Sequence, residues 1–324
     1  MAPVDTITGQ YGSIAELSHE LSSLAWPADF RQLDCGTGQA GFEALMTDDA
    51  IVQGIFLERR TQQFFCAPEG LQSYGLPSGR VAFTSVPKQP AKPNDLLLRM
   101  EAGSGVEAIS EPGFSAFTLS FGKHRISELA ENLGLPDPGG TKDSRGLELF
   151  NDPILLSPLR ATLCQLFESR RDEKLSYAGK SALHETIKSE IPAMLLVATS
   201  ASQPKNRPSL RNRERVLKRA LEFIKEHPQE ALSVERLCVA SASSMSTLER
   251  AFLDRYSMSP KRYTLVKRLH HVHKALLRQA ETGKVAIYEV ANDWGFWHMG
   301  KFAADYKKLF GYLPSQTAKS EQKK

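Results

Sequence analysis

The stretch Ile287–Ser315, IYEVANDWGFWHMGKFAADYKKLFGYLPS, has the pattern of two helices separated by a tight turn. It predicts a short helix near residues 285–293, the turn Trp294-Gly-Phe-Trp, and a second helix over residues 299–310 that Gly311 stops. In this arrangement the second helix can enter the major groove of DNA while the first crosses the backbone. The stretch therefore indicates a DNA-reading unit.

The same pattern occurs about 50 residues upstream. Ser233 can cap a short helix, and the polar turn Ser241-Ala-Ser-Ser leads into a second helix that ends near Tyr256. Between the two units, Ser259-Pro260 opens a long helix to about Gln279. About 20 residues at ~1.5 Å each give a connector of roughly 30 Å, close to the ~34 Å of one DNA turn. We therefore expect one chain to place two reading helices in successive major grooves.

Residues 212–318 resemble the arabinose-regulator (AraC/XylS) family of bacterial transcription factors. The second unit is similar to the family signature of Ile, Ala, Gly-Phe, an apolar-x3-aromatic helix, Phe-Gly and Pro, although Ala242 stands at the usual turn glycine of the first unit. The first unit keeps Leu248, Arg250, Phe252, Ser259-Pro260, Tyr263 and Arg268. A finer resemblance, to the ethanolamine-operon regulator branch, rests on GFWHMGKFAADY, Trp26, Gln32-Leu33 and Gly75-Leu-Pro77. The resemblance implies a small-molecule effector that acts through the N-terminal domain.

Helical geometry separates the core face of the first reading helix from its outer face. If Leu248 and Phe252 face the core, Ser246 and Arg250 face outward, with Thr247 and Glu249 to the sides. Arginine can bond guanine O6 and N7 with two parallel hydrogen bonds, and glutamate can accept from cytosine N4. For Arg250, a phosphate contact or an internal ion pair are the alternatives to a base contact.

The outer face of the second reading helix offers fewer groups that read bases. With Phe302, Tyr306 and Leu309 in the core, this face centres on Gly300 and Ala304 and is flanked by lysines. We expect the first helix to supply most of the sequence discrimination, and the second to contact phosphates and a thymine methyl group. The predicted DNA-binding residues are Ser246, Thr247, Glu249, Arg250, His298, Met299, Gly300, Lys301, Ala304 and Lys308.

The net charge also differs between the N-terminal and C-terminal parts of the chain. The 324 residues have a formal net charge of +4. Residues 205–324 hold 24 Lys and Arg against 12 Asp and Glu, a net charge of +12, which leaves −8 for residues 1–204. A local excess of this size favours a polyanionic partner, so double-stranded DNA is the expected ligand of the C-terminal part.

The part of the chain that precedes the C-terminal domain is predicted to form a β-rich domain followed by helices. Short strand-like runs between Phe30 and Phe121 alternate with Pro- and Gly-containing turns, which is typical of an antiparallel barrel or sandwich. The expected fold class is α+β multidomain, with a cupin-like N-terminal barrel or sandwich, flanking helices, and an all-α C-terminal domain. The expected divisions are a sensor domain at 1–122, a helical extension at 123–201, a linker at 202–212, the double helix-turn-helix domain at 213–318 and a tail at 319–324.

We therefore predict a sequence-specific transcriptional regulator without enzymatic activity, controlled by an unidentified effector or by dimerisation. The helices of residues 154–199 suit either a homodimer contact or core packing, and RNA polymerase is a further partner to consider. The aromatic candidates for an effector pocket are Trp26, Phe64, Phe65, Tyr74 and Phe83, with ordinary core packing as the alternative. Two other functions stay open, namely a DNA-binding module fused to an enzyme or nucleotide-binding domain, and an oligomerising regulator without ligand.

Other site types have weaker support in the sequence. Gly36-Thr-Gly38-Gln-Ala-Gly41 fits the dinucleotide motif G-x-G-x-x-G, but a β-like segment follows it, which favours a turn between two strands. The four cysteines are isolated and the three histidines of residues 270–273 do not share one face, so no metal, cofactor or DNA-alkylation sensor is expected. Residues 191–201 are too short an apolar stretch to cross a membrane, and we expect a cytoplasmic protein.

Overall fold

The computed structural model describes residues 4–23, 28–78, 83–85, 97–100, 105–137, 147–150, 152–170, 177–201, 212–281 and 285–319. The chain forms two compact units, the first comprising Met1–Phe30 and Gln39–Arg207, the second Arg31–Gly38 and Pro208–Lys324. The first unit thus contains residues of both the predicted sensor domain and the predicted helical extension, whereas residues 31–38 belong to the second unit. The predicted linker lies outside the described residues except for Asn212, where a helix begins.

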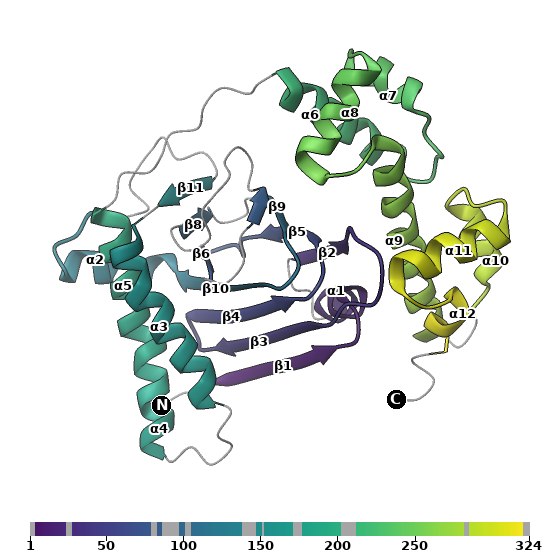
Figure 1. Ribbon diagram of the computed structural model, residues 1–324. Helices are drawn as coiled ribbons and strands as arrows, with labels where there is room; N and C mark the ends of the chain where they lie inside the picture. The colour runs from purple at the N-terminus through teal and green to yellow at the C-terminus, as the bar shows by residue number, and fades with distance from the viewer. Residues whose placement is uncertain are drawn as a thin grey trace. The chain divides into compact units, whose positions relative to one another are not determined.

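The first unit is built on two antiparallel sheets, and the larger one has seven strands in the order β1-β3-β4-β10-β6-β8-β11 (Figure 1). Its central strands are largely buried on both faces, so their sequences show no regular alternation of apolar and polar residues, and Gln72 and Ser73 are among the buried side chains. The strands are β1 (Asp5–Tyr11), β3 (Ala40–Met46), β4 (Ala50–Leu57), β6 (Leu71–Pro77), β8 (Leu97–Met100), β10 (Phe114–Gly122) and β11 (Leu147–Phe150).

The second sheet covers one face of the first. It has the order β2-β5-β9-β7, with bounds Ala28–Gln32, Thr61–Cys66, Gly105–Ser110 and Phe83–Ser85. One core joins the helix α1 (Ile14–Ser23) to inward residues of both sheets, among them Phe30, Phe42 and Ile55. The space between the sheets is therefore the interior of a β-sandwich, in agreement with the predicted fold class.

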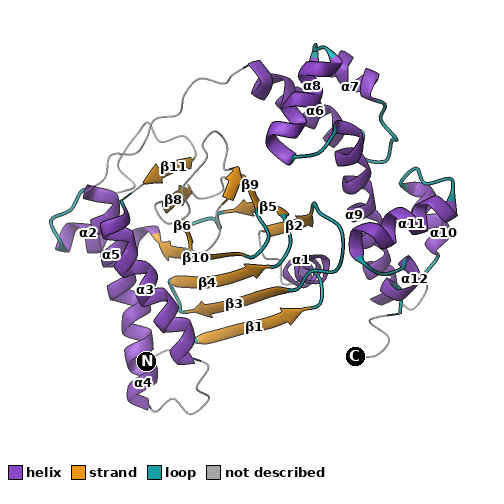
Figure 2. Cartoon of the chain, in the orientation of Figure 1, coloured by secondary structure: helices purple, strands orange, loops and turns teal. Residues whose placement is uncertain are grey.

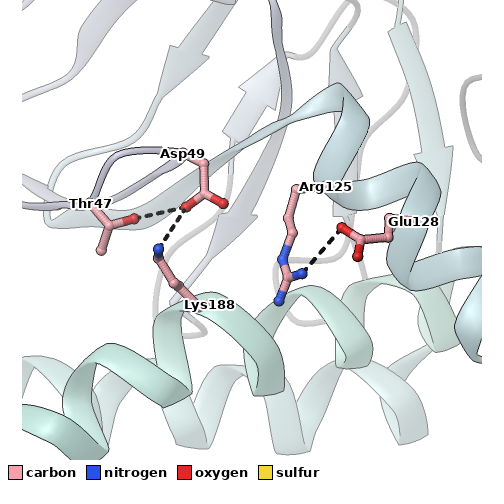
Figure 3. Close-up of polar contacts among 5 residues, drawn as sticks. All are labelled: Thr47, Asp49, Arg125, Glu128 and Lys188. Carbon is pink, nitrogen blue, oxygen red and sulfur yellow. Dashed lines mark hydrogen bonds and ion pairs between the residues drawn. The ribbon is translucent and has the colours of Figure 1, made fainter. Parts of the chain in front are cut away.

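Helices cover the other face of the large sheet through a second core, to which Tyr74 and Phe117 contribute. The Phe117 ring stacks on Phe167 at 5.6 Å between centroids. The helices are α2 (Lys123–Asn132), α3 (Pro153–Arg170), α4 (Tyr177–Glu185), a π-helical segment (Thr186–Glu190) and α5 (Ile191–Ala201). Figure 3 shows one polar link, in which Lys188 of the π-helical segment pairs with Asp49 at 3.7 Å, while Thr47 donates a hydrogen bond to the same Asp49 oxygen. The helical layer therefore shares its core with the sheet.

Helices form the second unit, apart from residues 31–38. In Figure 1 the helices that precede the long α9 (Pro260–Glu281) in the chain lie at one end of it, and those that follow it lie at its other end. The first group is α6 (Asn212–Glu226), α7 (Val234–Ser241) and α8 (Met245–Tyr256), and the second is α10 (Ile287–Asp293), α11 (Met299–Phe310) and α12 (Pro314–Thr317). Each predicted helix pair is present with its turn, drawn as a short loop in Figure 2.

The turn of the first helix pair contains an alanine in a conformation that favours glycine. Ala242 ends α7 with φ of 49° and ψ of 53°. An L-residue with a Cβ in this left-handed region costs about 1–2 kcal/mol, whereas glycine loses only about 0.5–1 kcal/mol of extra backbone entropy on folding. Ala242 is exposed, so a glycine there would remove the strain without leaving a cavity.

We therefore expect Ala242→Gly to stabilise the protein by about 0.5–1 kcal/mol, measured as an increase in the midpoint of denaturant unfolding. The matched control is Ala240→Gly, two residues earlier inside α7, which should destabilise by about 1 kcal/mol because glycine is a poor helix former. If both glycines lower the midpoint, the strain at Ala242 is not a source of instability.

Candidate nucleic-acid interface

The first reading helix, α8, is held by a cap and by two buried side chains. The Ser244 hydroxyl accepts from the Thr247 backbone NH at 3.3 Å, which closes the helix N-terminus. Leu248 and Phe252 are fully buried, and the ring of Phe252 lies edge-on to Tyr263 of α9 at 5.4 Å. This packing presents the opposite side of α8 to solvent.

The predicted contact residues of α8 lie on that outer side. Ser246, Glu249 and Arg250 are exposed, and Thr247 is half-buried. Arg250 has no ion pair within the described part of the chain, unlike Arg213, which pairs with Asp254 of the same helix at 2.5 Å. The described structure thus offers no support for an internal ion pair at Arg250, and its guanidinium faces solvent.

The second reading helix, α11, has the same two-sided design. Phe302, Tyr306 and Leu309 are buried at 2%, 0% and 2% exposure. The outer side carries His298, Gly300, Lys301, Ala304 and Lys308, all exposed, while Met299 is half-buried. Each predicted residue thus lies on a reading helix or directly before it, and the outer side of α11 combines small and basic residues.

Arg268 of α9 fixes the turn between α10 and α11. Its Nη1 donates to the backbone carbonyls of Trp294 and Gly295 at 3.3 and 3.1 Å, and its guanidinium lies 4.7 Å from the centroid of the Phe296 ring. Burial lowers the pKa of Arg268 below its ordinary value. Gly295 adopts φ of +72°, and a Cβ there would lie 2.8 Å from the Gln229 carbonyl oxygen. The turn therefore depends on a half-buried cation and on the absence of a side chain at Gly295.

The neighbouring histidines of α9 make packing contacts. His271 stacks on Trp294 at 4.3 Å with an interplanar angle of 4°. His273 is hydrogen-bonded through Nδ1 to the Tyr306 hydroxyl, which also lies 2.7 Å from Thr317 Oγ1. Burial raises the pKa of Tyr306 well above its ordinary value. The described residues contain no group of three or more His, Cys, Asp or Glu side chains that could hold a metal ion.

Two exposed aromatic residues beside α11 were absent from the predicted set. Trp297, in the turn before the helix, is 72% exposed, and Tyr288 of α10 is 61% exposed. Large apolar side chains with this exposure commonly mark an interaction surface. The signal in the sequence was Trp297 itself, which lies between the buried Phe296 and the first turn of α11 and fits no core position.

The first unit contains a small cavity between its two sheets, with room for about one water molecule. Its walls combine apolar side chains with the polar Gln53 and Thr118, which face each other on β4 and β10. The lining residues are Leu21, Ala28, Phe30, Phe42, Gln53, Ile55, Phe65 and Thr118.

Among the predicted pocket aromatics whose side chains the structure describes, one lines this cavity. Phe65 does, whereas Phe64 precedes it on β5 and points to the opposite face. Tyr74 is fully buried in the core under the helices. Trp26 lies outside the described residues, and of Phe83 only the backbone is described, in β7. Phe30, Phe42, Gln53 and Thr118 were missed, although Gln53 stands out as a polar residue between Ile51 and Ile55 on one strand face.

Gln63 is a buried polar group on the strand that supplies Phe65 to the cavity wall. It lies on the same face of β5 as Phe65 and is fully buried. Neither its side-chain nitrogen nor its side-chain oxygen has a hydrogen-bond partner in the described part of the protein. A buried amide without partners is costly, at about 1–3 kcal/mol, which is a reason to look for a ligand at this position.

The glycine motif of residues 36–41 forms no nucleotide-binding turn. Gly36 adopts φ of +102° in the loop after β2, and Gly41 lies inside β3, with no helix between the two strands. The interpretation as a turn between strands is confirmed. None of the described helices combines the length and apolarity needed to cross a membrane.

Comparison with known proteins matches the geometry of the second unit. Residues 237–320 match a protein family described as "Helix-turn-helix domain". The chain is 31% identical over 101 residues to the probable thc operon regulatory protein of Rhodococcus erythropolis. This alignment covers 31% of this chain and 30% of that protein. It is 33% identical over 105 residues to the XylDLEGF operon transcriptional activator of Pseudomonas putida, and this alignment covers 32% of each of the two chains.

The match to these relatives spans about a third of their length. Among solved structures, the chain is similar to the AraC-like transcriptional activator CuxR, with a TM-score of 0.42 and 13% identity over 82% of this chain and 93% of that one. Because the paired helices and the family match fall on the same residues, the C-terminal part of this chain contains a helix-turn-helix domain that is similar in sequence to part of the XylDLEGF operon transcriptional activator.

Proposed function

We propose that the protein is a sequence-specific, DNA-binding regulator of transcription rather than an enzyme. The observation that carries the proposal is the pair of reading helices, α8 and α11, attached through buried contacts to one 22-residue helix. That helix is about 33 Å long, close to the ~34 Å between successive major grooves on one face of DNA. The net charge of +12 over residues 205–324 adds attraction to phosphates.

The two helices are proposed to read DNA unequally. The outer side of α8 presents Arg250, Glu249 and Ser246, which can distinguish bases, whereas that of α11 presents Gly300, Ala304 and lysines. Selection of bound sequences from a random DNA pool, followed by base-pair swaps in each half-site, tests this. We expect swaps in the α8 half-site to lower affinity more. Equal losses in both half-sites would contradict the unequal reading, and no enriched sequence at all would contradict the proposed function.

Lys301 is predicted to contact phosphate. Lys301→Ala should weaken binding to all DNA sequences by a similar factor and reduce the slope of log affinity against log salt by about one. Lys218→Ala is a suitable control because Lys218 is an exposed lysine of α6 that pairs with Glu222. Titrations at several salt concentrations measure both effects, and a loss confined to one DNA sequence would instead assign Lys301 to a base.

The inter-sheet cavity is the proposed effector site. Its aromatic walls Phe30, Phe42 and Phe65 suit an apolar molecule, and Gln63 with Gln53 suits a single polar group that donates or accepts hydrogen bonds. An effector larger than water would have to move the walls. Thermal shift assays with small apolar acids, amides and alcohols, and with ethanolamine because of the finer sequence resemblance, test the site. Gln63→Leu should abolish the shift of a true effector.

Further partners are also proposed. The relatives are named as operon regulators and activators, which favours activation and contact with RNA polymerase. A homodimer is supported by exposed apolar side chains on the helical layer, Ile154 of α3 at 82% and Val197 of α5 at 44%. Sedimentation of the full chain and of an Ile154→Glu variant would show whether this layer holds two copies together.

A further inference from the structure

The segment Arg31–Gly38, which continues strand β2, is packed within the helical unit. The side chain of Gln32 is 2% exposed, and its Nε2 donates to the backbone carbonyl of Leu309 at 3.0 Å and to the carbonyls of Asp34 and Gly36. The backbone NH of Gly36 lies 3.2 and 3.1 Å from the carbonyl oxygens of Lys308 and Leu309. The segment therefore binds the C-terminal end of reading helix α11.

These contacts supply hydrogen-bond donors to the C-terminal end of α11. The last four carbonyls of an α-helix lack a partner within the helix. In α11 the Lys307 carbonyl accepts from Gly311 NH at 2.8 Å, and those of Lys308 and Leu309 accept from the 31–38 segment. A distant part of the chain thus completes the hydrogen bonds of the second reading helix.

The same segment is also bound to α9. His270 of α9 is 3% exposed, and its Nε2 lies 2.8 Å from the Gln32 carbonyl oxygen, while its ring lies edge-on to Phe310. Arg262, in the first turn of α9, directs Nη2 to the Cys35 sulfur at 3.1 Å. Because α9 carries both reading helices, the segment contacts the connector and one reader together.

Gly311 allows the close approach. It ends α11 with φ of +86°, and a Cβ there would lie 2.5 Å from Thr37 Cγ2 and 2.8 Å from Thr37 N. Glycine therefore meets two needs at one position, the left-handed backbone of the helix end and the space for the 31–38 segment.

On its other side, the segment is continuous with a wall of the cavity. Ala28 and Phe30 of β2 line the inter-sheet space, and the segment begins at the next residue, Arg31. Phe30 is 1% exposed and packs edge-on against Phe65 at 5.7 Å. A molecule that enlarged the cavity by displacing Phe30 would pull or push directly on Arg31 and Gln32.

From these contacts we infer that the 31–38 segment is a positioning element for α11, with Gln32 as its central positioning residue, and that it couples the cavity wall of β2 to the second reading helix. Only the expected effect on DNA binding rests on the proposed function. The first consequence, protection of the α11 backbone, holds whether or not the protein binds DNA.

Hydrogen exchange of the full chain tests the first consequence. Gln32→Leu removes the side-chain donors and keeps the volume, so amides at the C-terminal end of α11 should exchange about tenfold faster, while those of α8 stay unchanged. Gln72→Leu is the matched control, because Gln72 is also a buried glutamine whose Nε2 donates to one carbonyl, that of Met100 at 2.8 Å, but inside the first unit. Unchanged exchange of α11 in Gln32→Leu would overturn the inference.

A second pair of variants tests the coupling to the cavity. Phe30→Leu and Phe42→Leu alter two buried walls of the same cavity, one on the strand that continues into the segment and one on β3. We expect exchange of α11 to change in Phe30→Leu only. Equal effects of the two variants, or none from Phe30→Leu, would reject the coupling.

DNA binding provides the functional measurement. With the selected operator, Gln32→Leu should lower affinity about tenfold, and this loss should disappear on a shortened operator that lacks the α11 half-site. A loss that is the same on both operators would contradict a role in positioning α11. If the wild-type chain selects no DNA sequence, the proposed function fails, while the exchange experiments still decide the role of the segment.

Discussion

Arg268→Ala is expected to unfold or loosen the second helix-turn-helix unit, at a cost of about 2–3 kcal/mol. The substitution leaves the carbonyls of Trp294 and Gly295 without their donor and removes the cation over the Phe296 ring. Both carbonyls belong to the turn that sets the direction of α11. The measurement is denaturant unfolding of the full chain, together with hydrogen exchange of residues 287–310.

The matched control is Arg278→Ala. Arg278 lies on the same helix and carries the same charge, but it is exposed near the helix end, so its loss should change stability by less than about 0.5 kcal/mol. Arg268→Lys adds a second comparison, because lysine keeps a positive charge without the planar fork of donors. It should recover only part of the stability. If Arg268→Ala and Arg278→Ala unfold at the same midpoint, the contact with the turn contributes nothing.

Arg250→Ala is expected to remove discrimination at one base pair of the α8 half-site, with a loss of about 1–3 kcal/mol on the preferred sequence. The reason is that Arg250 projects from the outer side of α8, close to its N-terminal turns, with no acidic partner among the described residues. A guanidinium in this position can reach the O6 and N7 atoms of guanine. Affinities for four operators that differ only at that base pair give the measurement.

Arg219→Ala provides the control for the charge itself. Arg219 is exposed on α6, and its removal takes away one positive charge from the helical unit without changing a reading helix. We expect it to weaken all four operators slightly and equally. If Arg250→Ala behaves in the same way, Arg250 contacts a phosphate, and the assignment of base reading to α8 passes to Glu249 and Ser246.

The helix pairs could be predicted because their signals are local. Caps, turn residues and apolar spacing lie within a few residues of the backbone they determine, as Ser244, Ala242 and Gly311 show. The predicted second reading helix, residues 299–310, coincides with α11. Only the short α12 was missed, and Pro314 at its first position was the available signal.

Strands were harder to predict where both of their faces are buried. The strands β3 and β6 pack between two layers and therefore show no alternation of apolar and polar residues by which a strand could be recognised. The edge strand β1 has a polar sequence, DTITGQY, that does not suggest burial. The sequence could not show which aromatic residues line the cavity for a related reason, since the choice between Phe64 and Phe65, or between Tyr74 and Phe42, depends on which layer each strand face meets.

By itself, the sequence determined the two-part organisation of the protein, the opposite charges of the two parts, and the two helix pairs with the outer faces of their reading helices. These features follow from local periodicity, capping and composition. The tertiary structure decided which side chains enclose the cavity, and that Arg268 holds the turn before α11. It also showed that residues 31–38 complete the end of that helix. Such contacts join residues up to 277 positions apart, and no local pattern records which distant carbonyl a buried glutamine will meet.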